Sequence, residues 1–560
     1  MTPPTAGGAP AGWLSRDCLA WMLSFLEADH ESIAMQTEAA VAAPPSSQGS
    51  GRLFALVFGV ILLIGGAYAG MHLVQDLSIV RTHATGPFIL LGIALLIALG
   101  FEFVNGFHDT ANAVATVIYT NSMPANMAVI WSGAFNFLGV LTSSGAVAFT
   151  VVSLLPVELI LQVGSQAGFS MVFALLFAAI LWNLGTWYFG LPNSSSHTLI
   201  GSIIGVGLAN QLISVKTGTS GVDWTAATGV FKGLIFSPIA GFILAGLLML
   251  ILKAVVKIPA LYRAPEGNKP PPWPIRALLV LTCTGVSFSH GSNDGQKGMG
   301  LIMLILIGTV PTAYALNGAV TGGQVKSFHE VSVEARQVLG SITNGAAVSG
   351  DPRADVTAAV QQRALLPTTG PALAQLIADI DQQVGSRTSL RAVPPEQMGN
   401  VRNDIYLANA AIPLVLTQPG LTKEQTATLT TWRGLGTQAI QFIPPWVKVA
   451  VALALGLGTM VGWKRIVVTV GEKIGKEHLT YAQGASAELV AMSLIQAADM
   501  YHLPVSTTHV LTSGVAGTMA ANGSGLQWAT VRNLLMAWVL TLPASILLAG
   551  GLYIVFRHLF

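Results

Sequence analysis

Long apolar runs separated by short polar segments make up most of the chain. A membrane-spanning helix needs about 20 mostly apolar residues. Eight stretches approach or exceed that length: Leu53–Val74, Phe88–Val104, Met127–Leu155, Phe169–Phe189, Gly229–Leu252, Val447–Val461, Ala485–Met500 and Leu534–Val555. Shorter apolar runs lie beside polar motifs at Ala111–Ile118, Thr198–Leu212, Ala277–Phe288, Gly298–Val310 and Val510–Ala521. The pattern predicts an all-α polytopic membrane protein with broken helices and about 10–12 membrane segments.

Composition supports a membrane protein rather than a soluble one. Hydrophobic residues make up 52% of the chain and charged residues only 9%, whereas soluble domains carry about 25% charged residues. A soluble helical enzyme would instead need amphipathic helices with one polar face. The net charge of +2 gives no reason to expect a nucleic-acid partner. Cys18 and Cys283 fit no disulfide or metal pattern.

Polar segments divide the chain. Residues 1–50 lack the basic start and the cleavage site of a signal peptide, so we interpret them as an N-terminal extension. The basic, proline-rich linker 253–275 is expected to face the cytoplasm, because short basic loops do so. Residues 311–445 form a polar, soluble insert that is too long for the charge rule to place on one side. The transmembrane parts are then repeat one, 51–252, and repeat two, 276–310 with 446–560.

The two transmembrane parts contain the same two motifs in the same order. Residues 103–109 (F-V-N-G-F-H-D) match 288–294 (F-S-H-G-S-N-D), and residues 191–199 (L-P-N-S-S-S-H-T-L) match 503–511 (L-P-V-S-T-T-H-V-L). The first pair is offset by 185 positions and the second by 312, and the difference of 127 is close to the length of the insert. Duplicated halves with broken apolar segments at matching places are typical of secondary transporters and indicate the binding site.

Each first motif ends in an aspartate, Asp109 or Asp294, within strongly apolar surroundings. A charge at membrane depth costs about 2.5–3.5 kcal/mol on insertion scales, so such a residue is usually functional. The alternative is an aspartate that caps a helix at the membrane interface. Gly106 and Gly291 lie three residues earlier, which favours a helix break or a close approach of two backbones.

Each second motif places three hydroxyl side chains between a proline and a new apolar run. This order is typical of a helix start, whose unpaired N–H groups and partial positive charge attract an oxyanion. Three hydroxyls exceed what capping needs, although capping is the simpler alternative. The histidines that follow, His197 and His509, either bond a neighbouring carbonyl or relay protons. The candidate anion ligands are Ser194, Ser195, Ser196, Ser506, Thr507 and Thr508.

Charge balance at such a site calls for a coupled cation. At roughly 4 Å and an effective dielectric constant of about 20, two like unit charges repel by about 4 kcal/mol. Two ionised aspartates would therefore repel a divalent oxyanion, and helix ends offset only part of this. The candidate cations are protons on the carboxylates, sodium between them or a metal ion on the anion. No cofactor and no fixed metal site are expected, because the histidine spacing matches no zinc site.

The paired motifs resemble those of the inorganic phosphate transporter (PiT) family. Its twin signature reads approximately G-A-N-D-V-[AS]-N, and the copies here are Gly106-Phe-His-Asp-Thr-Ala-Asn112 and Gly291-Ser-Asn-Asp-Gly-Gln-Lys297. The hairpin motifs Pro192–His197 and Pro504–His509 and the long insert also match. The amino-acid sequences of residues 288–300 and 470–475 are most similar to those of bacterial Pit-type permeases. The resemblance covers roughly residues 50–310 and 445–560.

The resemblance implies two inverted repeats with re-entrant hairpins, a phosphate site at the membrane midplane and alternating access. It implies a phosphate symporter integral to the plasma membrane, here a bacterial inner membrane, rather than an enzyme, and it leaves a homodimer open. By position, Asp109 and Asp294 would lie at the phosphate and coupling-ion site. Asn112 and Asn293 would hold a cation or orient an aspartate, and the six hydroxyls would bind phosphate oxygens, Ser195, Ser196, Thr507 and Thr508 foremost.

Two positions depart from the family signature. His108 replaces the first Asn of copy one and Lys297 replaces the second Asn of copy two, so a sodium site built from both Asn pairs is incomplete. We hypothesise that Lys297 supplies a fixed positive charge and that phosphate uptake is coupled to protons. The alternatives are sodium coupling, a metal–phosphate complex as cargo, and a Lys297 that only snorkels near a helix end.

Other functions also fit parts of the pattern. A sulfate or other oxyanion permease would use helix ends and hydroxyls almost as well, although acceptor carboxylates favour phosphate, which can donate hydrogen bonds. A membrane enzyme acting on phosphorylated lipid would need a nucleophile beside a base, whereas Ser-x-His recurs here symmetrically. A channel would lack the closed, stoichiometric site that the paired aspartates indicate.

Overall fold

The structure is a computed structural model that describes residues 48–78, 85–109, 111–155, 157–161, 165–213, 222–265, 267, 269–342 and 350–559. The chain divides into two compact units, Met1–Leu63 and Ile64–Phe560. Nearly all of the predicted N-terminal extension lies outside the described residues. The first unit is described only from Gln48, where helix α3 (Gln48–Leu77) begins.

The described part of the second unit is helical, apart from one isolated bridge between Gly475 and Leu526. The helices before the insert are α4 (Thr85–Asp109), α5 (Ala111–Tyr119), α6 (Ala125–Thr142), α7 (Ala146–Val152), α8 (Val157–Leu161), α9 (Gln166–Tyr188), α10 (Ser195–Ile213), α11 (Trp224–Val255), η1 (Pro259–Tyr262) and α12 (Trp273–Thr309). Those after the insert are α19 (Pro445–Thr459), α20 (Lys464–Val468), η3 (Thr469–Lys473), α21 (Tyr481–Met500), α22 (Thr507–Asn522) and α23 (Trp528–Leu559).

Seven of the described helices are long and apolar enough to cross a membrane, or eight if the bent pair α18 (Lys423–Ile440) and α19 counts as one span. The count is below the predicted number of about 10–12 segments. Three helices account for the difference, because α22 has only 16 residues, α12 carries many buried polar side chains, and α21 carries the buried Gln483, Ser486 and Glu488. The prediction of an all-α polytopic membrane protein is confirmed, whereas the inversion of the repeats stays a prediction.

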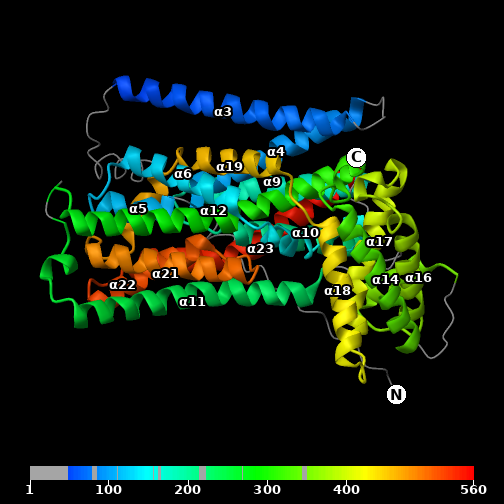
Figure 1. The fold of residues 1–560 in the computed structure, drawn as a ribbon. Helices are drawn as coiled ribbons and strands as arrows, with labels where there is room; N and C mark the ends of the chain where they lie inside the picture. Colours follow the sequence, from blue (N-terminus) through cyan, green and yellow to red (C-terminus); the bar gives the residue numbers. More distant parts are fainter. Residues whose placement is uncertain are drawn as a thin grey trace, which may run out of the picture. The chain divides into compact units, whose positions relative to one another are not determined.

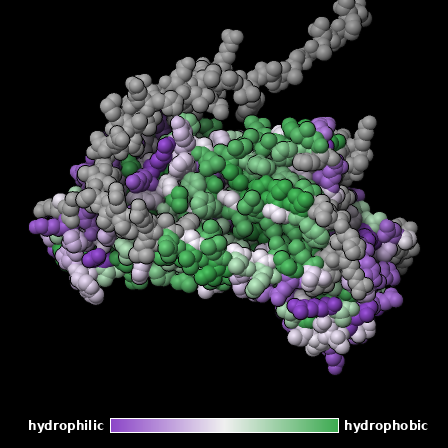
Figure 2. All heavy atoms as spheres, turned by 90° about the horizontal axis from the view of Figure 1, so that it is seen from above, coloured by the Kyte–Doolittle hydropathy of each residue, from purple (hydrophilic) through white to green (hydrophobic). Residues whose placement is uncertain are grey.

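Apolar side chains cover the outside of the long helices. Figure 2 shows a broad apolar area on the face seen, with hydrophilic residues gathered at its two ends. On α11 the side chains of Phe236 and Ile243 are exposed, and on α23 those of Val539 and Leu547. A soluble protein rarely exposes so much contiguous apolar surface. Lipid is the environment that such a surface requires.

Helices of the two repeats pack in exchanged pairs. Helix α10 of repeat one packs along α23 of repeat two, and α22 of repeat two packs along α11 of repeat one. In the same way α12 packs along α6, and α4 packs along α19. Each helix that carries a motif is therefore buried against the other repeat, and both motif pairs lie in the interior.

Two predicted helix boundaries are wrong. The expected single span Met127–Leu155 divides into α6 and α7, because Gly145 adopts a left-handed conformation with φ of 86°. The runs Ala277–Phe288 and Gly298–Val310, expected as separate half-length segments, belong to the single helix α12. Gly291 therefore marks a close approach of two backbones rather than a break. A Cβ atom at Gly291 would collide with the carbonyl of Asn136 in α6.

The insert consists of helices with a hydrophobic core of their own. They are α13 (Pro311–Tyr314), α14 (Gly322–Ile342), α15 (Pro352–Gln362), α16 (Thr369–Val384), η2 (Leu390–Ala392), α17 (Pro395–Val415) and α18. Their core includes Leu373, Ile405 and Trp432. Figure 1 shows α14, α16, α17 and α18 grouped at one end of the long helices α11 and α12 and running crosswise to them. That residues 311–445 form a soluble insert stays a prediction, with no side of the membrane assigned to it.

Candidate functional site

The two predicted aspartates lie close together in the interior. Asp109 is the last residue of α4 and is 3% exposed, and Asp294 lies in the middle of α12 and is fully buried. One ligand atom of each of Asp109, His290 and Asp294 lies within 4.8 Å of the others. The structure thus brings together two carboxylates that are 185 positions apart in the sequence.

Lys297 provides the positive charge beside Asp294. Its Nζ lies 2.5 Å from Asp294 Oδ1, one turn earlier on α12. The same ammonium donates hydrogen bonds to Ser196 Oγ and, at 3.2 Å, to the carbonyl of Val505. Lys297 is 2% exposed, so the alternative of a lysine that snorkels to the interface is wrong. One side chain therefore contacts the aspartate motif and the hydroxyl segments of both repeats.

The first hydroxyl of each cluster caps a helix. Ser194 Oγ accepts a hydrogen bond from the backbone N–H of His197 at 3.1 Å, and Ser506 Oγ accepts one from His509 at 3.1 Å. These contacts begin α10 and α22 in the same manner in both repeats. The capping alternative is therefore correct for Ser194 and Ser506, and a role as phosphate ligands stays a prediction.

Two of the remaining hydroxyls, those of Ser196 and Thr507, contact Lys297 and Asp294. Ser196 Oγ donates to the carbonyl of Val505 at 2.8 Å, and Thr507 Oγ1 donates to Asp294 Oδ2 at 3.4 Å. Ser195 Oγ accepts from Asn183 Nδ2 at 3.2 Å, and Thr508 is buried. In each copy, one of the three hydroxyl side chains therefore caps a helix, and the other two are further polar groups in the interior.

The rings of the two predicted histidines are in contact, tilted relative to each other. The ring centroids of His197 and His509 are 4.5 Å apart, and His509 stacks on Trp538 at 4.2 Å. His197 Nδ1 also lies 2.9 Å from Ser194 Oγ. The pair joins the two hydroxyl segments, which fits a structural role; a proton relay stays a prediction.

Of the two predicted asparagines, the structure describes the side chain of one. Asn293 Nδ2 donates to the carbonyl of Leu503 at 3.1 Å, and its Oδ1 accepts from the N–H of Val505 at 3.5 Å. Asn293 therefore holds the segment that precedes α22. Asn112 lies in the first turn of α5, and its side chain lies outside the described side chains.

Three further side chains lie in the interior beside the aspartates: His108 and His290, which the sequence ranks below the repeated residues, and Glu102, which the sequence did not single out. His290 Nδ1 lies 2.9 Å from Asn136 Oδ1, and its Nε2 lies 3.3 Å from Asp294 Oδ2. His108 Nδ1 lies 2.8 Å from Asp109 Oδ1. Glu102 in α4 is also fully buried beside this group. His108 and His290 belong to the motifs but lack repeat symmetry, and Glu102 precedes its motif by one residue, so a search for repeated residues passes over all three.

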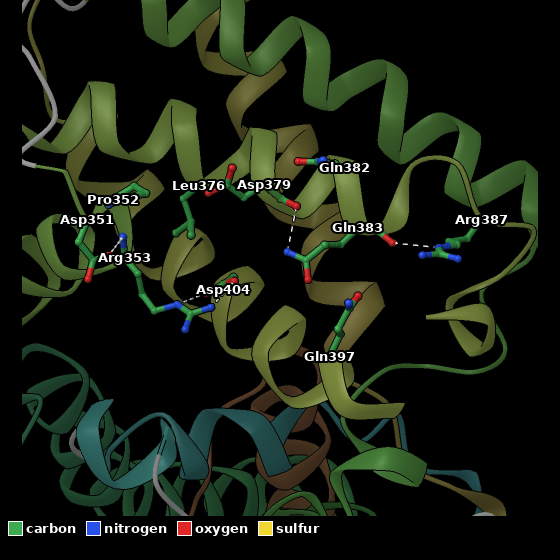
Figure 3. A pocket seen from close by; sticks show the side chains of 10 residues that line it. All are labelled: Asp351, Pro352, Arg353, Leu376, Asp379, Gln382, Gln383, Arg387, Gln397 and Asp404. Atoms are coloured by element: carbon green, nitrogen blue, oxygen red, sulfur yellow. Dashed lines mark hydrogen bonds and ion pairs between the residues drawn. The ribbon is translucent and has the colours of Figure 1, made fainter. Parts of the chain in front are cut away.

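The insert contains a separate cavity of about 570 Å³. Figure 3 shows Arg353 pointing at Asp404 across it, and the guanidinium donates to both carboxylate oxygens at 2.6 and 2.7 Å. Burial raises the pKa of Asp404, and Arg353 counteracts part of this rise. The motif residues lie elsewhere, in the membrane helices. The lining residues are Asp351, Pro352, Arg353, Leu376, Asp379, Gln382, Gln383, Arg387, Gln397 and Asp404.

Comparison with known proteins gives relatives over most of the chain. The chain is 44% identical over 485 residues to the low-affinity inorganic phosphate transporter PitA of Escherichia coli K12, which covers 83% of this chain and 96% of the relative. Its identity to PitB of the same organism is 41%, with the same coverage. Its identity to a probable low-affinity inorganic phosphate transporter of Bacillus subtilis is 29%, covering 84% and 99%.

A solved structure of a sodium-dependent phosphate transporter is similar at 17% identity with a TM-score of 0.46, covering 84% of this chain and all of that one. The profile of the phosphate transporter family matches residues 105–549. The relatives are named as transporters, and the chain is an integral membrane protein and not an enzyme. From the profile match over most of the chain and the identity to PitA and PitB, we conclude that this chain belongs to the phosphate transporter family.

Proposed function

We propose that this protein takes up inorganic phosphate in symport with protons by alternating access. Support for phosphate as the substrate comes from the family and from the names of the relatives. Support for a secondary transporter comes from the duplicated motifs and the exchanged packing of the helices that carry them. The homodimer stays a prediction.

The chemistry of the interior residues supports an oxyanion site. The first turns of α10 and α22 offer backbone N–H groups and a partial positive charge. Lys297 adds a full positive charge, and Ser196 and Thr507 add hydroxyl groups that can exchange their present partners for phosphate oxygens. The Asp294 carboxylate can accept a hydrogen bond from a protonated phosphate, which sulfate cannot donate at neutral pH.

The buried pair of Lys297 and Asp294 is the observation that carries the proposed proton coupling. The Lys297 ammonium lies 2.5 Å from the Asp294 carboxylate. A sodium-coupled transporter would need this position to be free for a sodium ion and to be lined by ligands for it. A covalently attached cation neutralises the aspartate but cannot be transported. The positive charge that accompanies phosphate must then come from protons or from the cargo itself.

A metal–phosphate complex is a second form of the cargo that one observation favours. Asp109, His290 and Asp294 present ligand atoms within 4.8 Å of one another. Carboxylates and an imidazole suit a divalent metal ion better than a bare phosphate. In this proposal the metal belongs to the substrate and leaves with it.

Uptake of labelled phosphate by proteoliposomes tests the function. Proton, sodium and magnesium gradients are imposed one at a time on wild type and on Asp294→Asn. We expect a pH gradient alone to drive accumulation of phosphate in wild type and to fail in Asp294→Asn. The matched control is Asp351→Asn in the insert, where Asn caps α15 as well as Asp does.

Three outcomes would contradict parts of the proposal. If phosphate uptake required a sodium gradient and did not respond to a pH gradient, sodium and not protons would be the coupled cation. If excess sulfate inhibited the uptake of labelled phosphate as strongly as excess unlabelled phosphate does, the protein would be a general oxyanion permease. Flux that neither saturates nor runs uphill would indicate a channel.

A further inference from the structure

Glu102 is a buried acid that the proposed site does not yet use. It lies on α4, seven residues before Asp109, and is fully buried. Its carboxyl group rests against the backbone of Gly298 on α12, where a Cβ atom would collide with it. Gly298 follows Lys297 directly, so the acid lies next to the residue that carries the buried ammonium.

The Glu102 carboxyl has few hydrogen bonds. Oε2 accepts one from Asn105 Nδ2 at 3.4 Å, and Oε1 has no partner of normal geometry among the residues that the structure describes. Glu488, another buried acid, receives hydrogen bonds from the hydroxyls of both Thr116 and Thr282. An ionised carboxylate without donors is very costly away from water. In this conformation the Glu102 carboxyl therefore has little hydrogen-bond support for a negative charge.

The charges around Glu102 bear on whether it can ionise. Asp294 on α12 opposes a negative charge there, and Lys297 on the same helix favours one. The other helices packed on α4 carry few titratable groups: His197 on α10, Tyr119 on α5, Tyr188 on α9 and Lys448 on α19. Lys448 donates to the carbonyl of Ser143. Lys297 is therefore the nearby cation whose position can decide the protonation of Glu102.

The repeat symmetry breaks at Glu102. The equivalent position in repeat two is Ser287, whose hydroxyl lies 2.7 Å from Ser132 Oγ. The aspartates are duplicated, whereas this acid occurs in one copy only. A single acid beside a single lysine fits a mechanism in which one proton is transported in each cycle.

We propose that Glu102 carries the transported proton, an inference that rests on the proposed proton symport. With phosphate bound, Lys297 pairs with Asp294 and Glu102 keeps its proton. When phosphate leaves, the Lys297 ammonium turns to Glu102, the carboxyl O–H bond breaks and the proton passes to water. Lys297 keeps its own proton throughout. Reprotonation of Glu102 from the opposite side and rebinding of phosphate restore the starting state.

The test compares two kinds of transport in proteoliposomes that hold the full-length chain, with labelled inorganic phosphate as the probe. Accumulation driven by a pH gradient requires release of the proton, whereas counterflow exchange of phosphate for phosphate does not. We expect Glu102→Gln, a permanent mimic of the neutral acid, to lose accumulation to the level of protein-free vesicles and to retain counterflow. Glu102→Asp should keep accumulation with a shifted pH profile.

Glu472→Gln is the matched control, because Glu472 accepts a hydrogen bond from Tyr119 at 2.8 Å that an amide oxygen can also accept. We expect it to accumulate phosphate as wild type does. If Glu102→Gln accumulates phosphate from a pH gradient, Glu102 is not the proton carrier. If Glu102→Gln loses counterflow while Glu102→Asp shows the wild-type pH profile, the inference also fails. A wild-type protein that ignores the pH gradient would instead overturn the proton symport itself.

Discussion

The ammonium of Lys297 lies 2.5 Å from the Asp294 carboxylate, inside the helix bundle and one turn further along the same helix. Breaking a buried ion pair by removing one partner is far more disruptive than breaking an exposed one, because a charge remains in low dielectric. In the proposed proton symport this pair decides which cation the site requires, and substitutions at Lys297 therefore test the coupling directly.

Replacing Lys297 by Asn, the residue of the family signature, is expected to change the coupling ion. The variant leaves Asp294 without its attached cation and offers an amide oxygen as a ligand. Phosphate accumulation should lose its response to a pH gradient and gain a response to sodium. Lys297→Arg, which keeps the charge, serves as the control. Phosphate uptake by Lys297→Asn that is driven by pH and indifferent to sodium would contradict the role assigned to this lysine.

The close approach at Gly291 predicts a large effect of one methyl group. Gly291→Ala would push α12 away from the backbone of Asn136 and should destabilise the protein by about 1–3 kcal/mol. Thermal unfolding in detergent measures the loss. Gly434→Ala on α18 is the control: nothing lies near its Cβ position, and removing a helical glycine should stabilise by about 0.5–1 kcal/mol. Equal melting temperatures for the two variants would argue against tight packing at Gly291.

One hydroxyl of each cluster caps a helix and the other two lie in the interior. Substitutions in the clusters should therefore affect either stability or phosphate binding. Ser506→Ala removes a cap and should lower stability by about 0.5–2 kcal/mol, whereas Ser506→Gly should cost only a few tenths. Ser196→Ala removes a hydroxyl beside Lys297 and should raise the KM for phosphate with little change in melting temperature. The comparison of KM with melting temperature separates the two effects. A raised KM for Ser506→Ala at unchanged stability would reverse the assignment.

The cavity of the insert predicts a pH-dependent stability. Because burial raises the pKa of Asp404, the folded insert binds this proton more readily than the unfolded chain does, and stability falls as pH rises above the ordinary carboxyl range. Arg353 limits this loss. Since Arg353 is half exposed, Arg353→Gln should cost about 1–2 kcal/mol at pH 7.

Hydrogen exchange of α15 and α17 at pH 7 and pH 5 measures the effect of Arg353→Gln, which should be smaller at the lower pH. Arg387→Gln at the same cavity is the control, because among the described residues Arg387 pairs with no carboxylate and donates to the carbonyl of Gln383. The double variant Arg353→Gln with Asp404→Asn should recover part of the loss. A destabilisation that is equal at both pH values would contradict the role of the Asp404 charge.

Repetition in the sequence predicted the meeting of Asp109 with Asp294 and the burial of both hydroxyl clusters, because equivalent segments of a duplicated fold occupy equivalent depths. It could not predict that Lys297 contacts Ser196, since that contact depends on how helices of different repeats pack. Gly291 allowed either a helix break or a close approach of two backbones, because the identity of a glycine does not distinguish the two, and the structure shows the close approach. Glu102 was missed because its counterpart is Ser287, and only the fold reveals that it rests on Gly298.

A structure of the full-length protein in a lipid nanodisc with phosphate is the most direct test of the central claim, which is that the duplicated motifs bind the transported anion. We expect density for one tetrahedral anion within hydrogen-bonding distance of Lys297, Ser196 and Thr507. Phosphate density confined to the cavity of the insert at saturating phosphate, with none beside Lys297, Ser196 and Thr507, would contradict the claim.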